Sequence, residues 1–357
     1  MVNSKRLRNI FFKLVRIDSP TGEENEAIRE VLDYLRKLHL RPTKDKAGNI
    51  FVSVPGRGSP LLLEAHLDTV EPGRGIIPYQ RGEYLYSEGG NILGADDKAS
   101  VAIILELLNL ICENNSKCRP LEIVFSTGEE GGSVGISKFN FRKIKAREAV
   151  GMDRAKRVGI ITSASPHIKS FELTIIGKSS HAGAEPEKGI NAIVLAARVI
   201  SRLVVGRIDQ ETTFNIGLIS GGQGTNIVPE QVIFKGDIRS FSRVKLEQLI
   251  KKMKKVAQDE CVKEKARYKL KIIREVAGYK HRHSDSLIKQ ICKAMRKMRV
   301  TPELTISTGA SDLNIINEYQ IKAVEIANGV RDAHTKKERV RIKDLIKMVE
   351  ILVEIIK

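Results

Sequence analysis

The stretch LLLEAHLD, residues 61–68, is the part of the sequence from which the fold can be inferred most directly. Its apolar run is typical of a buried strand, and the run ends in His66 and Asp68. Side chains alternate along a strand with a period of two, so His66 and Asp68 point to the same face. A histidine in that position can bind a metal ion while the carboxylate steadies its ring. The triplet alone could also be an exposed strand end, so its interpretation depends on the rest of the chain.

Further acidic residues and a second histidine follow other apolar runs. They are Asp96 and Asp97 in NILGADDK, Glu129 and Glu130 in IVFSTGEEGG, Asp153 in AVGMD, and His334 in DAHTKKE. A two-metal hydrolase needs a carboxylate that bridges cations about 3.5–4 Å apart, which Asp96–Asp97 could supply, although one of these aspartates could simply cap a helix. Adjacent Glu129 and Glu130 face different directions, so one can bind metal while the other reaches a water molecule. The ordered set therefore predicts a hydrolase with two divalent metal ions.

The pattern along the chain indicates two domains, as a length of 357 residues also suggests. In the first, apolar strands alternate with helices, which is typical of a mixed, mainly parallel α/β sheet with ligands beyond the carboxyl ends of its strands. The capping-box spacing of Thr21 and Glu24 predicts a helix that starts near residue 22. The other elements expected here are strands at 50–54 and 61–65, a helix at 99–110, a strand at 121–125, a short helix at 133–139 and a strand that ends at Met152.

From about Phe171 the expected order changes to β-α-β-β-α-β, which is a split βαβ unit. Its elements are expected at 171–176, 189–204, 213–219, 232–238, 244–262 and 267–276. After it, helices at 287–298, 312–317 and 342–356 and a strand at 322–327 return the chain to the first sheet. The sequence therefore predicts a metal-binding α/β domain formed by residues 1–168 and 279–357, with an inserted α+β lid domain at residues 169–278.

The net charge of +18 is unevenly distributed, because residues 251–300 hold 17 Lys and Arg against 5 Asp and Glu. A nucleic-acid-binding surface would explain this charge, but lysines on the outer faces of helices are the simpler explanation. No DNA- or RNA-binding motif accompanies the basic stretch. Trp is absent and aromatic residues make up 5%, which is a poor supply for stacking bases. We therefore do not expect a nucleic-acid partner.

The four cysteines have no CxxC spacing, which argues against a thiolate zinc site and gives no disulfide framework. The N-terminal run IFFKLVRID is interrupted by charged residues, as in an amphipathic helix and not as in a signal peptide. No run approaches the roughly 20 apolar residues of a membrane span. These features predict a cytoplasmic protein without membrane contact.

Taken together, the motifs resemble those of the zinc-dependent peptidase and amidohydrolase family that includes peptidase T, carboxypeptidase G, aminoacylase and succinyl-diaminopimelate desuccinylase. The matching segments are His66–Asp68, Gly94–Lys98, Glu129–Gly131, Met152–Asp153, Gly177–Gly183 and His334–Thr335. They span nearly the whole chain, and the motifs ADDK and Met152–Asp153 are most similar to those of the peptidase T-like branch. A second family, of aminopeptidases with two cocatalytic metals, shares the His-x-Asp and Asp-Asp elements. The SSHAG segment at the start of the split βαβ unit favours the first family.

The resemblance implies two metal ions per chain, with zinc expected and cobalt or manganese as alternatives. The implied ligands are Asp96, bridging both ions, His66 and Asp153 at one ion, and Glu130 and His334 at the other. Glu129 would be the general acid/base and Asp68 would orient His66. The ions would lower the pKa of a shared water, so that a hydroxide forms and attacks an amide carbonyl. The resemblance also leads us to expect a cis peptide bond between Asp96 and Asp97.

In the lid, the resemblance implies that His181 stabilises the tetrahedral oxyanion. In the family this residue often acts on the partner subunit, which points to a homodimer formed through the lid. Asn226 and Arg239 resemble residues that hold a substrate carboxylate, a role that suits the forked guanidinium, although Arg239 could equally be a surface residue at a strand end. Gly309 and Ser311 resemble part of a substrate-binding loop, although Ser311 could equally be a helix N-cap.

The implied activity is that of a metallopeptidase acting on short peptides, nearest to a tripeptide aminopeptidase. An N-acyl-amino-acid deacylase or a carboxypeptidase would use the same metal chemistry, because lid contacts and not the motifs set specificity. A rival from another class is a basic nucleic-acid-binding protein on an inactive scaffold of this kind. Such a protein would lack a ligand or the base, whereas all the expected ligands and Glu129 are present.

Overall fold

The computed structural model describes residues 1–114 and 118–357, which form two compact units. Unit 1 comprises residues 1–163, 280–307 and 311–357, and unit 2 comprises residues 164–279 and 308–310. The predicted division after residues 168 and 278 lies close to these limits. The structure adds the short segment 308–310 to unit 2.

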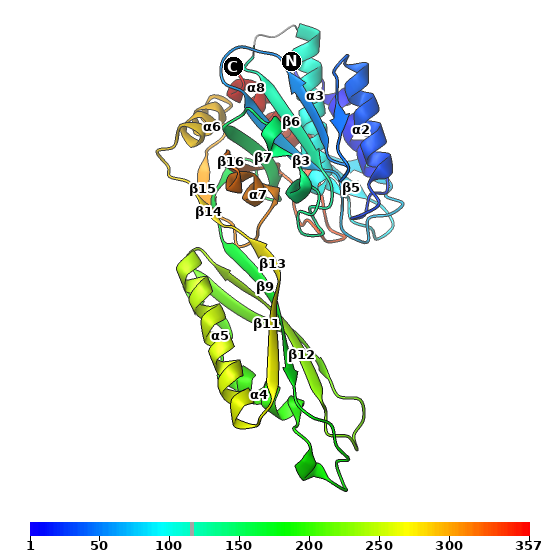
Figure 1. Cartoon of the computed structure of the whole chain (residues 1–357). Coiled ribbons are helices and arrows are strands. Elements are labelled where there is room, and N and C mark those ends of the chain that lie inside the picture. The colour runs from blue at the N-terminus through cyan, green and yellow to red at the C-terminus, as the bar shows by residue number, and fades with distance from the viewer. Residues whose placement is uncertain (115–117) are drawn as a thin grey trace. The chain divides into compact units, whose positions relative to one another are not determined.

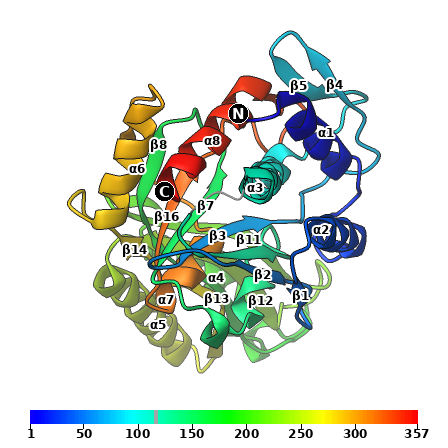
Figure 2. The same cartoon turned by 90° about the horizontal axis from the view of Figure 1, so that it is seen from above.

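Unit 1 is built on a mixed nine-stranded sheet with the order β1-β2-β6-β3-β7-β16-β8-β14, in which β15 also pairs with β8 (Figures 1 and 2). The strands are β1 (Thr43–Lys44), β2 (Ile50–Val54), β3 (Leu61–His66), β6 (Leu121–Ser126), β7 (Glu148–Arg154), β8 (Ile160–Ser165), β14 (Tyr279–Lys280), β15 (Glu303–Ile306) and β16 (Lys322–Ala327). The four central strands β6, β3, β7 and β16 are parallel, whereas β2 and β8 pair antiparallel with the strands next to them. The predicted mixed, mainly parallel sheet is confirmed.

Both faces of this sheet are covered, as the alternation of side chains along β3 illustrates. Leu61 and Leu63 join the larger core on one face, while Leu62 joins a smaller core on the other. Helices α1 (Ser4–Val15), α3 (Ala95–Asn114) and α8 (Ile342–Ile355) pack together in the larger core. The short helix α7 (Asp312–Glu318) lies over the smaller one (Figure 2). Parallel strands buried on both faces hold their carboxyl ends in one rigid edge.

Two further helices complete unit 1, namely α2 (Asn25–Lys37) and α6 (Ser286–Lys297). A small three-stranded sheet of β4 (Pro78–Arg81), β5 (Tyr84–Ser87) and β17 (Val340–Arg341) lies apart from the main sheet. The rings of Tyr79 on β4 and Tyr86 on β5 are stacked, with their centroids 5.6 Å apart. The sequence patterns did not predict this sheet, because its strands are too short to show a period.

Unit 2 has the predicted β-α-β-β-α-β order with one additional edge strand. Its elements are β9 (His167–Ile176), α4 (Ala192–Ser201), β10 (Gly206–Asp209), β11 (Thr212–Gly221), β12 (Gln231–Ser240), α5 (Arg243–Lys263) and β13 (Arg267–Val276). The antiparallel sheet has the order β10-β11-β12-β9-β13, and both helices pack against its apolar side chains (Figure 1). We refer to this unit as the lid.

Two local predictions were wrong in detail. The helix predicted from residue 22 begins at Asn25, because the hydroxyl of Thr21 donates to Asp68 and does not cap the helix. The short helix predicted at 133–139 is only a 3₁₀ turn, Ile136–Lys138. In both places tertiary contacts determine the backbone and override the local pattern.

The basic stretch, residues 251–300, contains the second part of the amphipathic helix α5 (Arg243–Lys263). The lysines of this part point outward, as expected. Lys251, Lys252, Lys254 and Lys255 are exposed, and Met253 between them is buried in the lid core. Within residues 1–114 and 118–357, no helix is both long enough and apolar enough to cross a membrane.

The fold includes one buried ion pair whose loss we expect to be costly. The side chain of Glu106 on α3 is fully buried and accepts hydrogen bonds from Arg6 Nε at 2.6 Å and Arg6 Nη2 at 2.9 Å. Substituting Arg6→Ala leaves this carboxylate without its cation, which should destabilise the protein by about 3 kcal/mol. The melting temperature of the metal-free protein should fall by roughly 6–12 °C. The control Arg29→Ala removes only an exposed pair with Glu26 and should change it little; equal melting temperatures for both variants would refute the prediction.

Candidate metal centre

Four of the five predicted metal ligands lie at or after the carboxyl ends of the four parallel strands, and the fifth, Asp96, lies at the start of a helix. His66 is the last residue of β3, Asp153 is the last residue but one of β7, and Glu129–Glu130 follow β6. His334 follows β16, and Asp96 lies at the start of α3. Parallel strands end at one edge of their sheet, so residues more than 250 positions apart in the sequence meet there.

One group of ligand atoms is formed by His66, Asp96 and Asp153, whose atoms lie within 4.8 Å of one another. His66 Nε2 is 3.6 Å from Asp96 Oδ1 and 3.7 Å from Asp153 Oδ1. These distances are too long for hydrogen bonds, so the three side chains surround a common space.

A second group is formed by Asp96, Glu130 and His334, again within 4.8 Å. His334 Nε2 is 3.3 Å from Asp96 Oδ2 and 2.8 Å from Glu130 Oε1. Asp96 therefore belongs to both groups, with Oδ1 facing His66 and Oδ2 facing His334. This is the arrangement that a carboxylate bridging two cations requires.

The residues present fit divalent cations. His66 is 1% exposed, and its Nε2 has no hydrogen-bond partner among the described residues although it faces two carboxylates. A buried nitrogen in this state is costly unless something binds it. Imidazole nitrogens and carboxylate oxygens are ligands that zinc and similar ions accept.

The electrostatics of the metal-free site reflect crowded carboxylates. Burial, together with the negative charge of Asp96, raises the pKa of Asp153 well above its usual range. For Asp96 burial acts in the same direction, but the neighbouring His334 and His66 outweigh it and lower its pKa. Hydrogen bonds to Asp96 and Glu130 raise the pKa of His334 to about 10. The site thus holds protons that a bound cation would displace.

The side chain of Asp68 contacts several groups besides His66. Its carboxylate oxygen Oδ1 lies 3.3 Å from His66 Nδ1 and also accepts the backbone N–H of Glu129 at 3.0 Å. The other oxygen, Oδ2, accepts the backbone N–H of Glu130 at 3.1 Å and the hydroxyl of Thr21 at 2.7 Å. One fully buried carboxylate therefore contacts both the predicted ligand His66 and the turn that carries the two glutamates.

Glu129 lies beside the first group, since a carboxylate oxygen of Glu129 is within 4.8 Å of ligand atoms of His66 and Glu130. Burial raises the pKa of Glu129 well above its usual range, and the negative charges of Asp312, Glu130 and Asp96 add to this effect. A carboxylate whose proton affinity is raised in this way is suited to general acid/base work.

The two adjacent aspartates have separate surroundings. Asp97 is fully buried, and its Oδ1 accepts a hydrogen bond from Asn328 at 3.2 Å. The Asp96–Asp97 peptide bond is cis, which confirms the prediction made from the resemblance. Asn328 could not be identified from the sequence, because nothing in its neighbourhood marks it as a partner of Asp97.

Glu338 is a second residue that the sequence patterns did not single out. It is 2% exposed and accepts the backbone N–H groups of Gly94 at 2.7 Å and Asp96 at 3.0 Å. Its position four residues after His334 is the only sequence signal that could have drawn attention to it.

In the lid, His181 is exposed and its ring orientation is set by the backbone. Its Nδ1 accepts the N–H groups of Gly183 at 3.1 Å and Ala184 at 3.0 Å. In the neutral ring an accepting Nδ1 leaves the proton on Nε2. The side chain therefore presents Nε2–H as a donor.

The other residues predicted to bind substrate have the following surroundings. Arg239 Nε donates to Asp237 at 2.7 Å, and its Nη1 donates to the carbonyl of Thr308 at 2.9 Å, so part of its guanidinium is already committed within the lid. Asn226 has an exposed side chain. These positions are compatible with the predicted roles but do not test them.

Two predicted residues lie in the segment that precedes α7. Gly309 accepts a hydrogen bond from Ser165 at 2.8 Å through its carbonyl. Ser311 is 7% exposed and donates its hydroxyl to Glu325 at 3.0 Å, which favours a structural role at the start of α7. Substrate binding by either residue stays a prediction.

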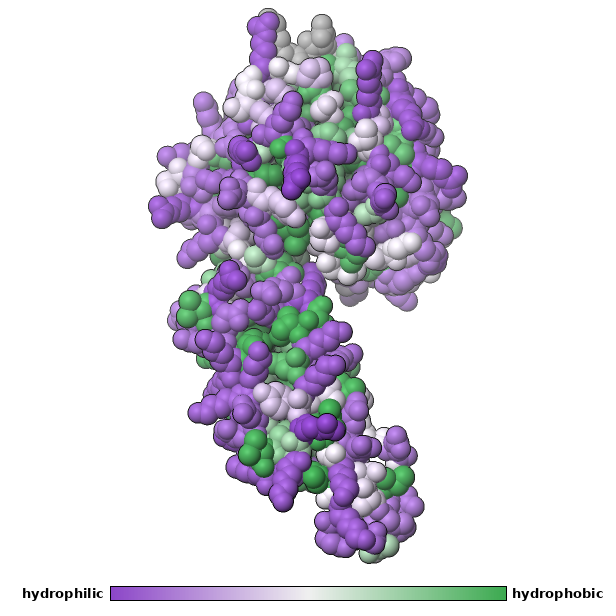
Figure 3. Space-filling model, viewed as in Figure 1, coloured by the Kyte–Doolittle hydropathy of each residue, from purple (hydrophilic) through white to green (hydrophobic). Residues whose placement is uncertain are grey.

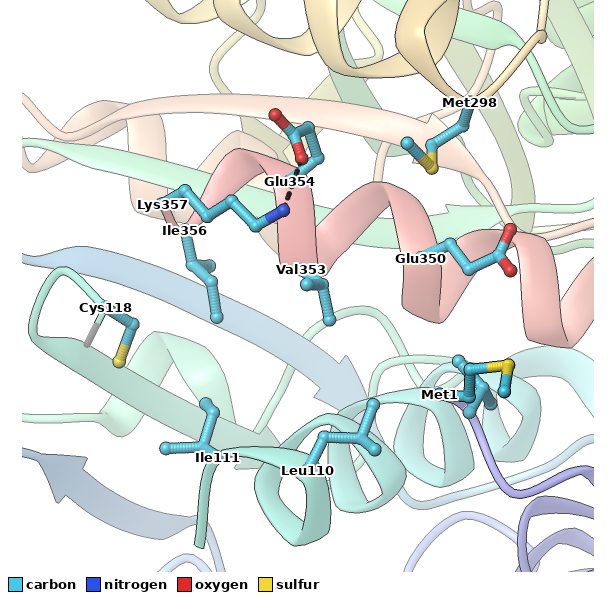
Figure 4. Close-up of a pocket in the computed structure, with 11 residues that line it drawn as sticks. Met1, Leu110, Ile111, Cys118, Met298, Glu350, Val353, Glu354, Ile356 and Lys357 are labelled. Carbon is cyan, nitrogen blue, oxygen red and sulfur yellow. Dashed lines mark hydrogen bonds and ion pairs between the residues drawn. The ribbon is translucent and has the colours of Figure 1, made fainter. Parts of the chain in front are cut away.

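A cavity of about 490 Å³ lies elsewhere in unit 1, between the end of α3 and α8 (Figure 4). Leu110, Ile111, Val353 and Ile356 supply its apolar walls. None of the predicted ligands lines it, so it is not part of the candidate metal centre.

Two known sequence families match separate parts of the chain. The profile described as "Peptidase dimerisation domain" matches residues 164–265, which lie within the lid. The profile described as "Peptidase family M28" matches residues 49–157. The second match contains His66, Asp68, Asp96, Glu129, Glu130 and Asp153.

Individual relatives match over almost the full length. The uncharacterized protein YqjE of Bacillus subtilis is 35% identical over 366 residues, covering 100% of this chain and 99% of its own. The crystal structure of the aminopeptidase PepT from Bacillus cereus is 33% identical with a TM-score of 0.91, covering 99% of this chain and 98% of that one. The crystal structure of a tripeptidase from Staphylococcus aureus is 32% identical with a TM-score of 0.94, covering 100% and 98%.

The shared position of Asp96 predicts how metal content responds to substitution. The wild-type chain should hold two ions after dialysis against buffered zinc, as measured by elemental analysis. Asp96→Ala should lose both, because the bridging ligand contributes to each group, and His334→Ala should lose one.

Glu129→Ala is the matched control, since it removes a neighbouring carboxylate of the same site. It should keep both ions and lose most turnover, because it removes proton transfer and not ligation. A folded wild-type protein that persistently binds one ion or none would contradict the two-ion arrangement.

Proposed function

The chain belongs to the peptidase T-like family of metallopeptidases, and we propose that it is a dinuclear zinc aminopeptidase that removes the N-terminal residue of short peptides, tripeptides in particular. The observation that carries the dinuclear part is the orientation of Asp96, whose two oxygens face two different histidines. The aminopeptidase part is supported by the 33% and 32% identity to the PepT and tripeptidase structures over nearly the whole chain.

The residues that would hold the ions are His66, Asp153 and Asp96 at one position, and Glu130, His334 and Asp96 at the other. When bound, two such ions supply Lewis acidity that polarises the peptide carbonyl and makes a water molecule more acidic. The zinc preference follows from the mixed nitrogen and oxygen ligands, and cobalt or manganese would suit the same set.

Glu129 carries the proton in this proposal. Its carboxylate takes a proton from the attacking water and gives it to the nitrogen of the leaving amine, so that the peptide C–N bond breaks with no net charge gained by the residue. Asp68 holds the backbone of Glu129 through a hydrogen bond of 3.0 Å. The base is therefore fixed before substrate arrives, which lowers the reorganisation needed during the reaction.

His181 is proposed to stabilise the oxyanion through its Nε2–H. A donor that needs no proton rearrangement is suited to this, and its orientation is supported by the two backbone N–H groups on Nδ1. Arg239 and Asn226 are proposed to hold the substrate carboxylate, Arg239 through the part of its fork that is not bonded to Asp237 and Thr308.

A homodimer formed through the lid is also part of the proposal. The dimerisation-domain match at residues 164–265 supports it. Figure 3 shows hydrophobic residues among hydrophilic ones on the surface of the lid. The exposed large hydrophobic side chains of the lid include Leu218 at 67% exposure and Ile219 at 60%, which support an assembly because such side chains are often covered by a partner.

The substrate assignment can be tested with metal-loaded protein. Free di- and tripeptides should be cleaved with release of the N-terminal amino acid, as followed by chromatography of the products. N-acetylated peptides of the same sequence should be poor substrates, because an aminopeptidase recognises the free amine. Release of the C-terminal residue would indicate a carboxypeptidase, and hydrolysis of N-acetyl amino acids alone would indicate a deacylase.

The proposed donor predicts a specific kinetic effect. His181→Ala should lower kcat by about 10²–10³-fold while the metal content stays at the wild-type value, because the ring stabilises the oxyanion and does not bind metal. Mixing inactive His181→Ala and inactive Glu129→Ala proteins under subunit exchange should restore activity in hybrid dimers if the lid serves a partner subunit. Proven exchange without restoration would show that the lid serves its own chain.

A further inference from the structure

We propose that Glu338 is a positioning residue that locks the bridging Asp96 and the ligand His334 into one unit, so that the two metal positions form together. The proposal rests on the dinuclear site described above. Within residues 1–114 and 118–357, the carboxylate of Glu338 is hydrogen-bonded to backbone N–H groups and to no predicted ligand side chain, so its effect would pass through the backbone.

The first step is what Glu338 does to Asp96. Its Oε1 accepts the backbone N–H of Asp96 at 3.0 Å and its Oε2 accepts that of Gly94 at 2.7 Å. Gly94 has a φ of +65°, a conformation that favours glycine, and it turns the chain immediately before the aspartate. Both oxygens of one buried carboxylate thus hold the turn that presents Asp96.

The second step is the loop that carries Glu338. Arg331 and Arg339 close the base of this loop, with N–H to carbonyl distances of 2.8 and 3.1 Å. Inside it, the hydroxyl of Thr335 donates to the carbonyl of Asp332 at 2.7 Å. The backbone N–H of Glu338 also donates to the carbonyl of Thr335 at 3.0 Å, so hydrogen bonds within residues 331–339 link Glu338 to the turn that carries His334.

These two steps connect the halves of the metal centre. His334 and Asp96 lie on segments more than 230 residues apart, yet Glu338 on the loop of one ligand grips the backbone of the other. Asp96 must aim Oδ1 toward His66 and Oδ2 toward His334 at once. A small rotation of the Asp96 backbone would move both oxygens out of place, so the hydrogen bond from this backbone to Glu338 affects both metal positions.

The alternative is that Glu338 merely satisfies buried backbone groups. The chain offers a matched control for this, because Glu122 is also buried and accepts the backbone N–H groups of Lys145 and Ala146 at 2.9 Å each. Glu122 accepts backbone hydrogen bonds in the same way, but the segment that it holds carries no predicted metal ligand. Comparing the two residues separates a structural effect from an effect on the metal centre.

The experiment is a calorimetric titration of metal-free full-length protein with zinc for the wild type, Glu338→Gln and Glu122→Gln. The glutamine can accept only one of the two N–H groups, so Glu338→Gln should weaken both binding steps by about 10–100-fold, the usual effect of losing a residue that supports a ligand. Glu122→Gln should leave both affinities unchanged, even if the melting temperatures of the two metal-free variants fall equally. Glu338→Asp keeps the charge but is shorter, and it should also weaken both steps.

Excess metal supplies a second readout. It should restore much of the kcat of Glu338→Gln at an unchanged KM, whereas it should not restore Glu129→Ala, which lacks the base. Wild-type zinc affinities in both Glu338 variants would overturn the proposal, and so would weakening of one step alone. A wild-type protein that binds no metal would refute the proposed function as well, which distinguishes the two failures.

Discussion

The predicted bridging role of Asp96 requires its two carboxylate oxygens to face two directions, and the arrangement of the candidate metal centre depends on this one requirement. A carboxylate can do so only if its backbone is held firmly, because a change in its orientation moves both oxygens together. The chain meets the requirement with a turn at Gly94, a buried carboxylate at Glu338 and the start of α3. The neighbouring Asp97 is fully buried and accepts a hydrogen bond from Asn328, and it belongs to neither ligand group.

Asp68 is a second buried carboxylate that contacts several groups of the candidate site at once. Asp68 accepts hydrogen bonds from the backbones of Glu129 and Glu130 while it lies against the ring of His66. A single fully buried carboxylate thus contacts a predicted ligand of β3 and the turn after β6 that carries the predicted base and another predicted ligand. Buried carboxylates are costly without partners, and this one is stabilised by every group that it positions.

The division into two units separates the predicted metal ligands and the predicted base from the predicted lid residues. Unit 1 holds all five predicted ligands and Glu129, and its sheet is buried on both faces, which makes the strand ends rigid. The lid carries His181, Asn226 and Arg239 on an antiparallel sheet with two helices on one face.

The sequence by itself determined the family, the mixed α/β sheet, the split βαβ lid and the residues that the structure gathers at the strand ends. Apolar periodicity predicted the first and last residues of strands β2, β13 and β16 correctly. The His-x-Asp and Asp-Asp motifs can be recognised in the sequence because each consists of residues close together in the chain. Only the tertiary structure decided that Thr21 serves Asp68 instead of a helix, that Asp97 pairs with Asn328, and that Glu338 holds the turn of Asp96. These contacts join segments up to 244 residues apart through single hydrogen bonds to side chains or backbone N–H groups. Such bonds have no period and no spacing in the sequence, because they exist only where the folded chain brings the two segments together.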